Sequence, residues 1–250
     1  MAGPTFTYDP MNRIKELSTT TSPVDDYQYT LDLTGNRKSA TEQSGRTLAW
    51  SYDGICRLTG ETITGDTSNN GNNNGSASYT LDPVGNRSSA VSSLAVVQSG
   101  SWGYNADDQL SSQTYDLDGN VTLAANGNSY TYDSQNHMLT ATSNGKTISM
   151  VYDAFGNRVG KTVNGVTTWY LVEDDVNPTG LPQVIEEKVN GAVQRVYTYG
   201  LQRISQYLNP TVTGNSTWTP SFYVYDGAGS VRQLTDSNGT PTFAKNHTEP

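Results

Sequence analysis

Short segments rich in β-branched and aromatic residues alternate along the chain with groups of Gly, Asn and Asp. Residues 162–171 form one such segment, and residues 184–189 and 193–197 form two more. Their composition is typical of β-strands. Asn190-Gly191 separates the last two, and this dipeptide favours the positive φ angles of a tight hairpin loop. We therefore predict a β-hairpin at Asn190-Gly191 and a second one at Asn164-Gly165.

One short motif returns from one end of the sequence to the other. Its most complete copy is Tyr152-Asp153-Ala154-Phe155-Gly156-Asn157-Arg158-Val159. Aligned on the aspartate, the other copies begin at Asp9, Asp32, Asp53, Asp82, Asn105, Asp116, Asp133 and Asp226. Repetition at such intervals indicates tandem structural units stacked on one another rather than a conventional globular domain.

The first eight copies are of two alternating kinds. In one kind a Gly-Asn dipeptide follows the aspartate: Gly35-Asn36, Gly85-Asn86, Gly119-Asn120 and Gly156-Asn157. In the other kind that glycine is missing and an apolar residue lies five positions after the first residue: Ile14, Leu58, Leu110 and Met138. The alternation has no exception over these copies, which makes a chance origin implausible.

Each copy has the chemistry of a bend between two strands. An Asp side chain accepts hydrogen bonds from backbone amides that follow it, and a Gly three residues later supplies a positive φ. A Tyr precedes the Asp in many copies, as at Tyr8, Tyr52 and Tyr152, and Tyr is common on half-buried pleated surfaces. Each period therefore predicts strand, turn, strand.

These motifs closely resemble the YD-repeat, or RHS-repeat, family, over nearly the whole chain from Phe6 to about Phe243. The resemblance implies an all-β fold in which tandem antiparallel β-hairpins form a curved, spiralling β-sheet. In that family the sheet makes a hollow shell that encloses a toxic C-terminal domain, as in bacterial polymorphic toxins. Residues 197–206 and 223–239 look like the start of the RHS-associated core region. The aspartate-containing self-cleavage signature of the family is missing beyond that point.

The resemblance divides the chain into a repeat array at 1–196 and a truncated core-like segment at 197–250. Residues 65–78 are Gly, Asn and Ser-rich with nothing to bury, so we expect a mobile loop inserted in a hairpin. Since the first residues run directly into a repeat, we expect a longer natural parent, secreted or at the cell surface. The sequence shows neither a signal peptide nor an apolar run long enough to span a membrane.

Composition agrees with this reading. Only 34% of residues are hydrophobic and 16 tyrosines stand against 4 phenylalanines, so we expect a thin core built largely from Tyr rings whose hydroxyls stay solvated or bonded. A net charge of −9 disfavours a nucleic-acid-binding surface. The single cysteine, Cys56, excludes an internal disulfide and a multi-cysteine metal site.

Residues that could carry chemistry each have a simpler interpretation. His137 lies in a turn and His247 near the C-terminus, without the arrangement that a catalytic triad needs. Asp116, Asp118 and Asn120 alternate as in some calcium loops, but the repeat itself explains two of the three. We therefore predict no catalytic, cofactor-binding or metal-binding residues.

Acidic clusters lead to the same conclusion. Glu186 and Glu187 are adjacent on a predicted strand, point to opposite faces and cannot share a site. The run Glu173-Asp174-Asp175 reads as a solvated turn. Asp82-Pro83-Val84-Gly85 has the letters of the self-cleavage signature, but it occupies a regular repeat position.

Three functions remain open. The first is a structural shell segment, whose partners would be an effector domain or neighbouring repeats of the parent. The second is a carbohydrate-binding module in which exposed tyrosines stack on sugar rings. The third is a hydrolase with carboxylates or a metal in a groove. In each case we expect self-association through open sheet edges.

Overall fold

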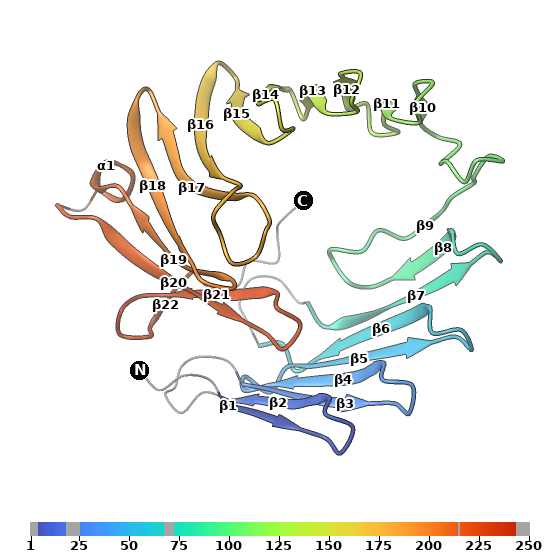
Figure 1. The fold of residues 1–250 in the computed structure, drawn as a ribbon. Helices are drawn as coiled ribbons and strands as arrows, with labels where there is room; N and C mark the ends of the chain where they lie inside the picture. The colour runs from blue at the N-terminus through green and yellow to red at the C-terminus, as the bar shows by residue number, and fades with distance from the viewer. Residues whose placement is uncertain (1–4, 19–25, 68–72, 215, 244–250) are drawn as a thin grey trace. The chain divides into compact units, whose positions relative to one another are not determined.

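The computed structural model describes residues 5–18, 26–67, 73–214 and 216–243. Within them the chain is β-structure apart from one helix of 4 residues. Strands that follow one another in sequence within a sheet are neighbours and pair antiparallel. Figure 1 shows this order from β1 to β8. The predicted all-β fold of tandem antiparallel hairpins is confirmed.

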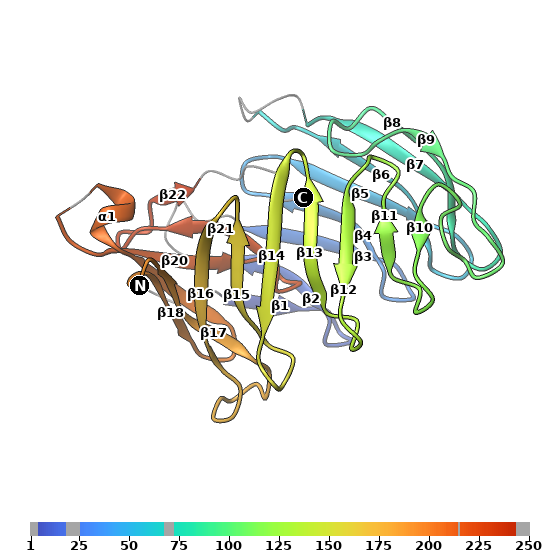
Figure 2. The same cartoon turned by 90° about the horizontal axis from the view of Figure 1, so that it is seen from above.

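The strands lie in two sheets. The 9-stranded sheet contains β1 (Thr5–Tyr8), β2 (Ile14–Ser18), β3 (Tyr27–Leu31), β4 (Arg37–Glu42), β5 (Thr47–Tyr52), β6 (Leu58–Thr64), β7 (Gly75–Leu81), β8 (Arg87–Ser92) and β9 (Gly100–Ser101). The 13-stranded sheet contains β10 (Thr114–Tyr115), β11 (Val121–Leu123), β12 (Ser129–Tyr132), β13 (Met138–Ser143), β14 (Lys146–Tyr152), β15 (Arg158–Val163), β16 (Val166–Glu173), β17 (Gln183–Val189), β18 (Ala192–Tyr199), β19 (Arg203–Leu208), β20 (Thr219–Tyr225), β21 (Val231–Thr235) and β22 (Pro241–Phe243). Figure 2 shows β10 to β16 side by side in sequence order.

The chain folds into two compact units. One comprises residues 1–108 together with 223–250, and the other comprises residues 109–222. The succession of paired strands stops after β9. The next copy, which begins at Asn105, is flanked only by isolated bridge residues, Tyr104 and Leu110. Few residues separate this copy from the next one at Asp116, so there is no length for a full strand. The prediction of strand, turn, strand therefore fails at this one copy.

The Tyr-Asp copies form tight corners as predicted. In the Gly-containing kind the glycine has positive φ, for example 98° at Gly35 and 84° at Gly156. In the other kind a non-glycine residue adopts the same conformation, with φ of 60° at Asn12 and 65° at Cys56. The missing glycine therefore changes the strain of the corner and not its shape. Because neighbouring strands are antiparallel, every second turn lies at the same end of the strands. The corners of each sheet therefore all lie at one end of its strands.

Both predicted Asn-Gly hairpins are present. Val189 pairs with Ala192 around Asn190-Gly191, and Val163 pairs with Val166 around Asn164-Gly165. Both residues of each loop have positive φ, which is the condition for a two-residue hairpin whose twist matches that of the strands. A third such loop, at Asn144-Gly145, links β13 and β14.

The loop predicted at residues 65–78 is shorter than expected, because β7 begins at Gly75. The middle of that loop lies outside the described residues. At its base, the Asp66 N–H donates to Asn74 Oδ1 and the Asn74 amide donates to the Asp66 carbonyl, each at 2.9 Å. The proposed boundary at residue 197, between repeat array and core-like segment, stays a prediction.

The helix, α1 (Pro210–Thr213), lies in the connection between β19 and β20 and was not predicted. Its signals are nevertheless local. Asn209 caps it by accepting from the Thr211 N–H, Pro210 occupies the first turn, and Gly214 ends it with φ of 71°. These are the residue types that begin and end helices.

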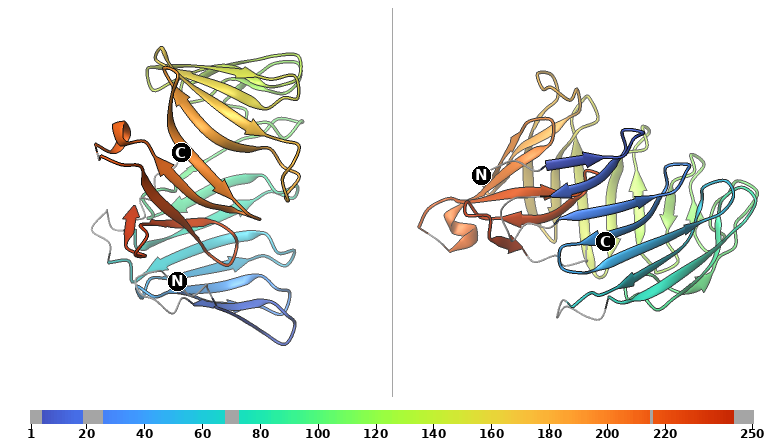
Figure 3. Two further views of the ribbon diagram at one scale, coloured as in Figure 1. Left: turned by 60° about the vertical axis from the view of Figure 1, so that its left-hand side comes forward. Right: turned by 90° about the horizontal axis from the view of Figure 1, so that it is seen from below.

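The hydrophobic core is thin, as the composition predicted. In the first unit Leu17, Tyr27, Tyr29 and Ala40 are buried together, and a second cluster contains Ile63, Ala77 and Leu94. Figure 3 shows the red C-terminal strands beside the blue N-terminal strands, and both belong to this unit.

Candidate functional site

The carboxylates of the corners are engaged in holding the turns together. At Asp53, Oδ1 accepts from the backbone N–H groups of Ile55 at 3.0 Å and Arg57 at 2.9 Å, and Oδ2 accepts from Arg57 Nε at 2.6 Å. The backbone N–H and the guanidinium of Arg57 hold the pKa of Asp53 below its ordinary value. A carboxylate held in this way is ionised at neutral pH and has its oxygens occupied.

The same arrangement recurs from corner to corner. At Asp153 the backbone N–H groups that donate to the carboxylate lie two and four residues after it, and at Asp32 the N–H of Asn36, four residues on, does the same. The pKa is lowered at seven of the corner aspartates: Asp9, Asp32, Asp53, Asp82, Asp116, Asp133 and Asp153. None of these groups therefore has the raised pKa that a general acid needs near neutral pH.

Side chains of one corner also reach the next. Arg57 Nη1 donates to the Asp82 carbonyl at 2.8 Å, and Arg13 makes the equivalent bond to Asp32 at 3.0 Å. The hydroxyl of Tyr52, the tyrosine before its corner, donates to the Arg37 carbonyl at 2.9 Å. These bonds join residues of neighbouring hairpins, so the motif residues hold both the turn and the array.

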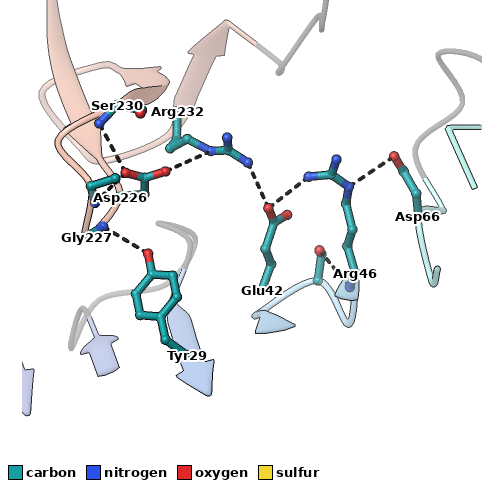
Figure 4. A network of polar contacts seen from close by, with 10 residues as sticks. Tyr29, Glu42, Arg46, Asp66, Asp226, Gly227, Ser230 and Arg232 are labelled. Carbon is teal, nitrogen blue, oxygen red and sulfur yellow. Dashed lines mark hydrogen bonds and ion pairs between the residues drawn. The ribbon is translucent and has the colours of Figure 1, made fainter. Parts of the chain in front are cut away.

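A second polar site lies where the hairpin of β20 and β21 meets the N-terminal strands of the first unit. We call this network the C-terminal clasp, and Figure 4 shows its main residues: Tyr29, Glu42, Arg46, Asp66, Asp226, Gly227 and Arg232. The Gly227 N–H donates to the Tyr29 hydroxyl at 3.0 Å. A Cβ at Gly227 would lie 2.9 Å from Tyr29 Cε2, so the close approach requires glycine.

Glu42 is the centre of the clasp. Its Oε1 accepts from Arg46 Nη1 and from Arg232 Nη2, each at 2.9 Å. Arg46 Nε lies 3.5 Å from Asp66 Oδ2, and Arg232 Nε lies 4.0 Å from Asp226 Oδ2. The Glu42 side chain is only 3% exposed, so its charge depends on these guanidinium groups rather than on water.

Electrostatics in the clasp favour a charged Arg232 and a neutral Tyr29. Burial works to lower the pKa of Arg232, but Tyr27, Glu42 and Asp226 raise it above its ordinary value. Burial raises the pKa of Tyr29, and the hydrogen bond from Gly227 partly offsets that effect. Arg232 is thus held charged and Tyr29 neutral at neutral pH, which suits a structural joint and not proton transfer.

Several tyrosine faces are covered by arginines. The guanidinium carbon lies 4.5 Å from the ring centroid for Arg37 over Tyr29, and 4.4 Å for Arg203 over Tyr197. Arg158 lies 5.6 Å from the Tyr170 centroid. Such cation–π contacts stabilise the packing of the tyrosine rings on the sheet.

The residues considered as candidates from sequence are dispersed. His137 Nδ1 lies 3.0 Å from Asp133 Oδ2 inside its own corner, and its ring stacks on Tyr152 with centroids 4.7 Å apart. No nucleophile joins this pair in the interactions of the described residues. His247 lies outside the described residues.

Asp116 and Asn120 hold a regular corner, with Asn120 Nδ2 donating to Asp116 Oδ2 at 3.0 Å. Asp118 donates its backbone N–H to the Asp116 carboxylate. Over the part of the chain that the structure describes, no three His, Cys, Asp or Glu side chains are grouped so that they could hold a metal ion.

Glu186 and Glu187 have different partners, as their positions on a strand predicted. Lys188 Nζ lies 3.1 Å from Glu186 Oε2, whereas Glu187 accepts from the Tyr197 hydroxyl at 2.6 Å. Burial and that bond to Glu187 raise the pKa of Tyr197. In the acidic turn, Glu173 accepts backbone N–H groups of Asp175 and Val176.

Asp82 lies in a regular corner, where its Oδ1 accepts from the backbone N–H groups of Val84, Gly85 and Asn86. Cys56 is exposed at the positive-φ position of its turn. Both therefore have roles that the repeat explains.

Sequence reasoning missed the clasp. Glu42 and Arg46 could have been found, because opposite charges four residues apart flank a glycine turn in Glu42-Gln43-Ser44-Gly45-Arg46. Arg232 could not, since 190 residues separate it from Glu42.

No helix of the described residues is both long and apolar enough to span a membrane.

Comparison with known proteins places these features in a wider group. No protein-family model matches the chain. It is 32% identical over 180 residues to the tRNA3(Ser)-specific nuclease WapA of Bacillus spizizenii, an alignment that covers 67% of this chain and 7% of that protein. The tRNA nuclease WapA of Bacillus subtilis is 30% identical over 180 residues, with the same 67% and 7% coverage.

In fold, the chain resembles a chain in the crystal structure of TcdB2-TccC3. The TM-score is 0.66 with 15% sequence identity, over 95% of this chain and 14% of that one. The repeated corners, the sequence relatives and the shared fold together show that this chain is a YD-repeat, or RHS-repeat, protein. It spans about 7% of the length of the curated relatives it matches.

Proposed function

We propose that this chain is a structural segment of a toxin-related RHS protein, and that its hairpins form part of a β-shell that encloses and delivers a C-terminal effector. The observation that carries the proposal is the use of the motif side chains. The polar atoms of Asp53, Arg57 and Tyr52 form hydrogen bonds within the turn and to neighbouring hairpins. A β-shell needs such hydrogen bonds between neighbouring hairpins, whereas a catalytic site needs polar groups that remain available to a substrate.

The relatives support this proposal and do not require nuclease chemistry here. The WapA proteins are named as tRNA nucleases, but the alignment covers only 7% of each. A net charge of −9 opposes binding of a polyanion such as tRNA. In our proposal the nuclease-type activity belongs to another region of the parent, which is secreted or displayed at the cell surface.

Carbohydrate binding is the weaker alternative. Stacking on a sugar needs open aromatic faces, whereas Tyr29 and Tyr197 are buried and Arg158 lies over the ring of Tyr170.

Two experiments test the proposal. The 250-residue chain is incubated with total tRNA beside a purified tRNA nuclease, and we expect no cleavage by the chain. Cleavage that survives repurification would overturn its structural role.

The second experiment uses the full-length encoded protein and limited proteolysis of its C-terminal region. We expect that region to be protected in the wild type and cut faster in the variant Asp53→Ala/Arg57→Ala, which loosens one corner of the wall. Equal rapid cleavage in both proteins would contradict enclosure. The same paired substitution at Glu186 and Lys188, a half-buried ion pair outside the corners, is the control.

A further inference from the structure

The first four corners present a row of exposed apolar side chains. Met11, Ile55 and Val84 lie two residues after the corner aspartate and Leu33 lies one residue after it, and Leu33 is 96% exposed. We call this row the corner strip. All four corners lie at the same end of the strands of the 9-stranded sheet, because each corner is separated from the next by two antiparallel strands.

The corner strip is continuous. Successive corners touch through the Arg13 bond to the Asp32 carbonyl at 3.0 Å and the Arg57 bond to the Asp82 carbonyl at 2.8 Å. Between the second and third corners, Cys56 Sγ lies 3.8 Å from Thr34 Oγ1. Two strand spacings separate neighbouring corners, about 9.6 Å, so the apolar side chains form a row along one end of the strands, and polar contacts join the turns that carry them.

The fold does not require apolar side chains at these positions. In the third corner it is the backbone N–H of Ile55 that bonds Asp53, and its side chain is exposed. A serine or threonine would make the same backbone bond. The apolar choice therefore has a reason outside the turn itself.

The chemistry of the strip is uniform. Between the first and the fifth residue of each of the four corners, every residue is uncharged: Pro10-Met11-Asn12, Leu33-Thr34-Gly35, Gly54-Ile55-Cys56 and Pro83-Val84-Gly85. The next copy, at Asn105, breaks this rule with Asp107 and Asp108. The strip of the 9-stranded sheet ends there, and exposed apolar side chains return at the corners of the other sheet with Leu117 and Phe155.

We propose that the corner strip is a self-association surface and packs against the same strip of a second copy of this chain. Four exposed side chains of this size offer on the order of 500 Å², which is the size of an apolar patch that marks an interaction site. Two such strips would bury roughly 1,000 Å² in total, the lower limit of a specific interface.

A second copy suits the strip because both have the same period. A row of side chains at regular spacing is complementary to itself when one copy is turned by a two-fold rotation, so that each side chain enters a gap of the partner. The three residues after each corner aspartate carry no charge, and the aspartates Asp9 and Asp53 are paired with Arg13 and Arg57, which limits the like-charge repulsion that a chain of net charge −9 would otherwise meet.

Sedimentation velocity over a range of concentrations tests this proposal on the 250-residue chain. We expect a dimer whose dissociation constant rises at least tenfold (about 1.4 kcal/mol) in Leu33→Ser and in Ile55→Ser. Each substitution acts twice in a symmetric dimer. Circular dichroism and thermal unfolding identify any variant that loses its fold, and such a variant is replaced by the paired threonine variants described next.

A matched pair of valines provides the control. Val84 in the strip is 72% exposed and Val91 on β8 is 70% exposed, so Val84→Thr and Val91→Thr change the same chemistry at equal exposure. We expect only Val84→Thr to weaken the dimer. A third variant, Phe6→Ser on the exposed edge strand β1, tests association through strand edges.

Three outcomes would overturn the proposal. The first is a wild-type chain that stays monomeric at about 100 μM, a concentration at which even weak contacts associate. The second is a dimer that Phe6→Ser abolishes and the strip variants leave intact. The third is a monomer that binds neutral phosphatidylcholine vesicles through the strip, because the occupant would then be lipid.

Discussion

Removing the Arg232 charge should loosen the C-terminal clasp measurably. The variant Arg232→Met keeps much of the side-chain volume and deletes the bond to Glu42 Oε1 at 2.9 Å. Breaking a buried ion pair costs about 3–5 kcal/mol when a charge is left uncompensated. Arg46 still holds Glu42, also at 2.9 Å, so we expect a smaller loss of about 1.5–3 kcal/mol, typical of one hydrogen bond to a charged group.

Amide hydrogen exchange is the suitable measurement, because the chain has two compact units and one global unfolding free energy would mix them. The reporter is the Gly227 N–H, which donates to the Tyr29 hydroxyl at 3.0 Å. We expect its exchange to accelerate about 10- to 100-fold in Arg232→Met, since each tenfold corresponds to about 1.4 kcal/mol. Tyr29→Phe removes the acceptor of this N–H, so its effect is measured on the free energy of unfolding instead, where loss of one neutral bond should cost only about 0.5–1.5 kcal/mol.

The double variant Arg232→Met/Glu42→Gln decides whether the two residues act together. We expect its loss to fall short of the sum of the single losses by about 0.5–3 kcal/mol, as for residues in one network. Additive effects, or exchange at Gly227 that is unchanged by Arg232→Met, would refute the argument that the ion pair holds the hairpin.

Three further predictions concern the corners. Cys56 has φ of 65°, so Cys56→Gly should relieve strain and raise stability by about 0.5–1 kcal/mol in thermal unfolding; a destabilised protein would contradict this. Gly156→Ala should cost more than Gly85→Ala, because both have positive φ but only at Gly156 would a Cβ lie 3.0 Å from His137 Nε2; equal losses would show that the histidine yields freely. Because the pKa of Asp53 is lowered in the folded chain, its stabilising contribution is present above the unfolded pKa of about 3.9 and is lost as pH falls through the folded pKa. Circular dichroism should therefore show stability constant from neutral pH to about 5 and falling below about 4, with a shallower fall in Asp53→Asn; an equally steep fall in that variant would count against the corner carboxylates.

Much of this molecule was determined by its local sequence. The corner at Asp153 and the hairpin at Asn190-Gly191 could be predicted because their chemistry acts within about four residues, where side-chain oxygen, amide and positive-φ position are neighbours. The alternation of the two kinds of corner followed in the same way. So did the absence of a shared site for Glu186 and Glu187, since neighbours on a strand point apart.

Tertiary structure alone decided the rest. Nothing near Tyr29 or Glu42 in sequence indicates that Gly227 and Arg232 contact them, because each contact joins residues separated by at least 190 positions and depends on how the hairpins pack. The end of the first sheet after β9 likewise depended on strand pairing. The few residues between the copies at Asn105 and Asp116 cannot form a full strand that would continue the hydrogen-bonded sheet. The four exposed side chains of the corner strip form one row because all four corners lie at the same end of the strands. Local turn chemistry specifies each bend, whereas the partners of a bend are chosen by the packing of the whole sheet.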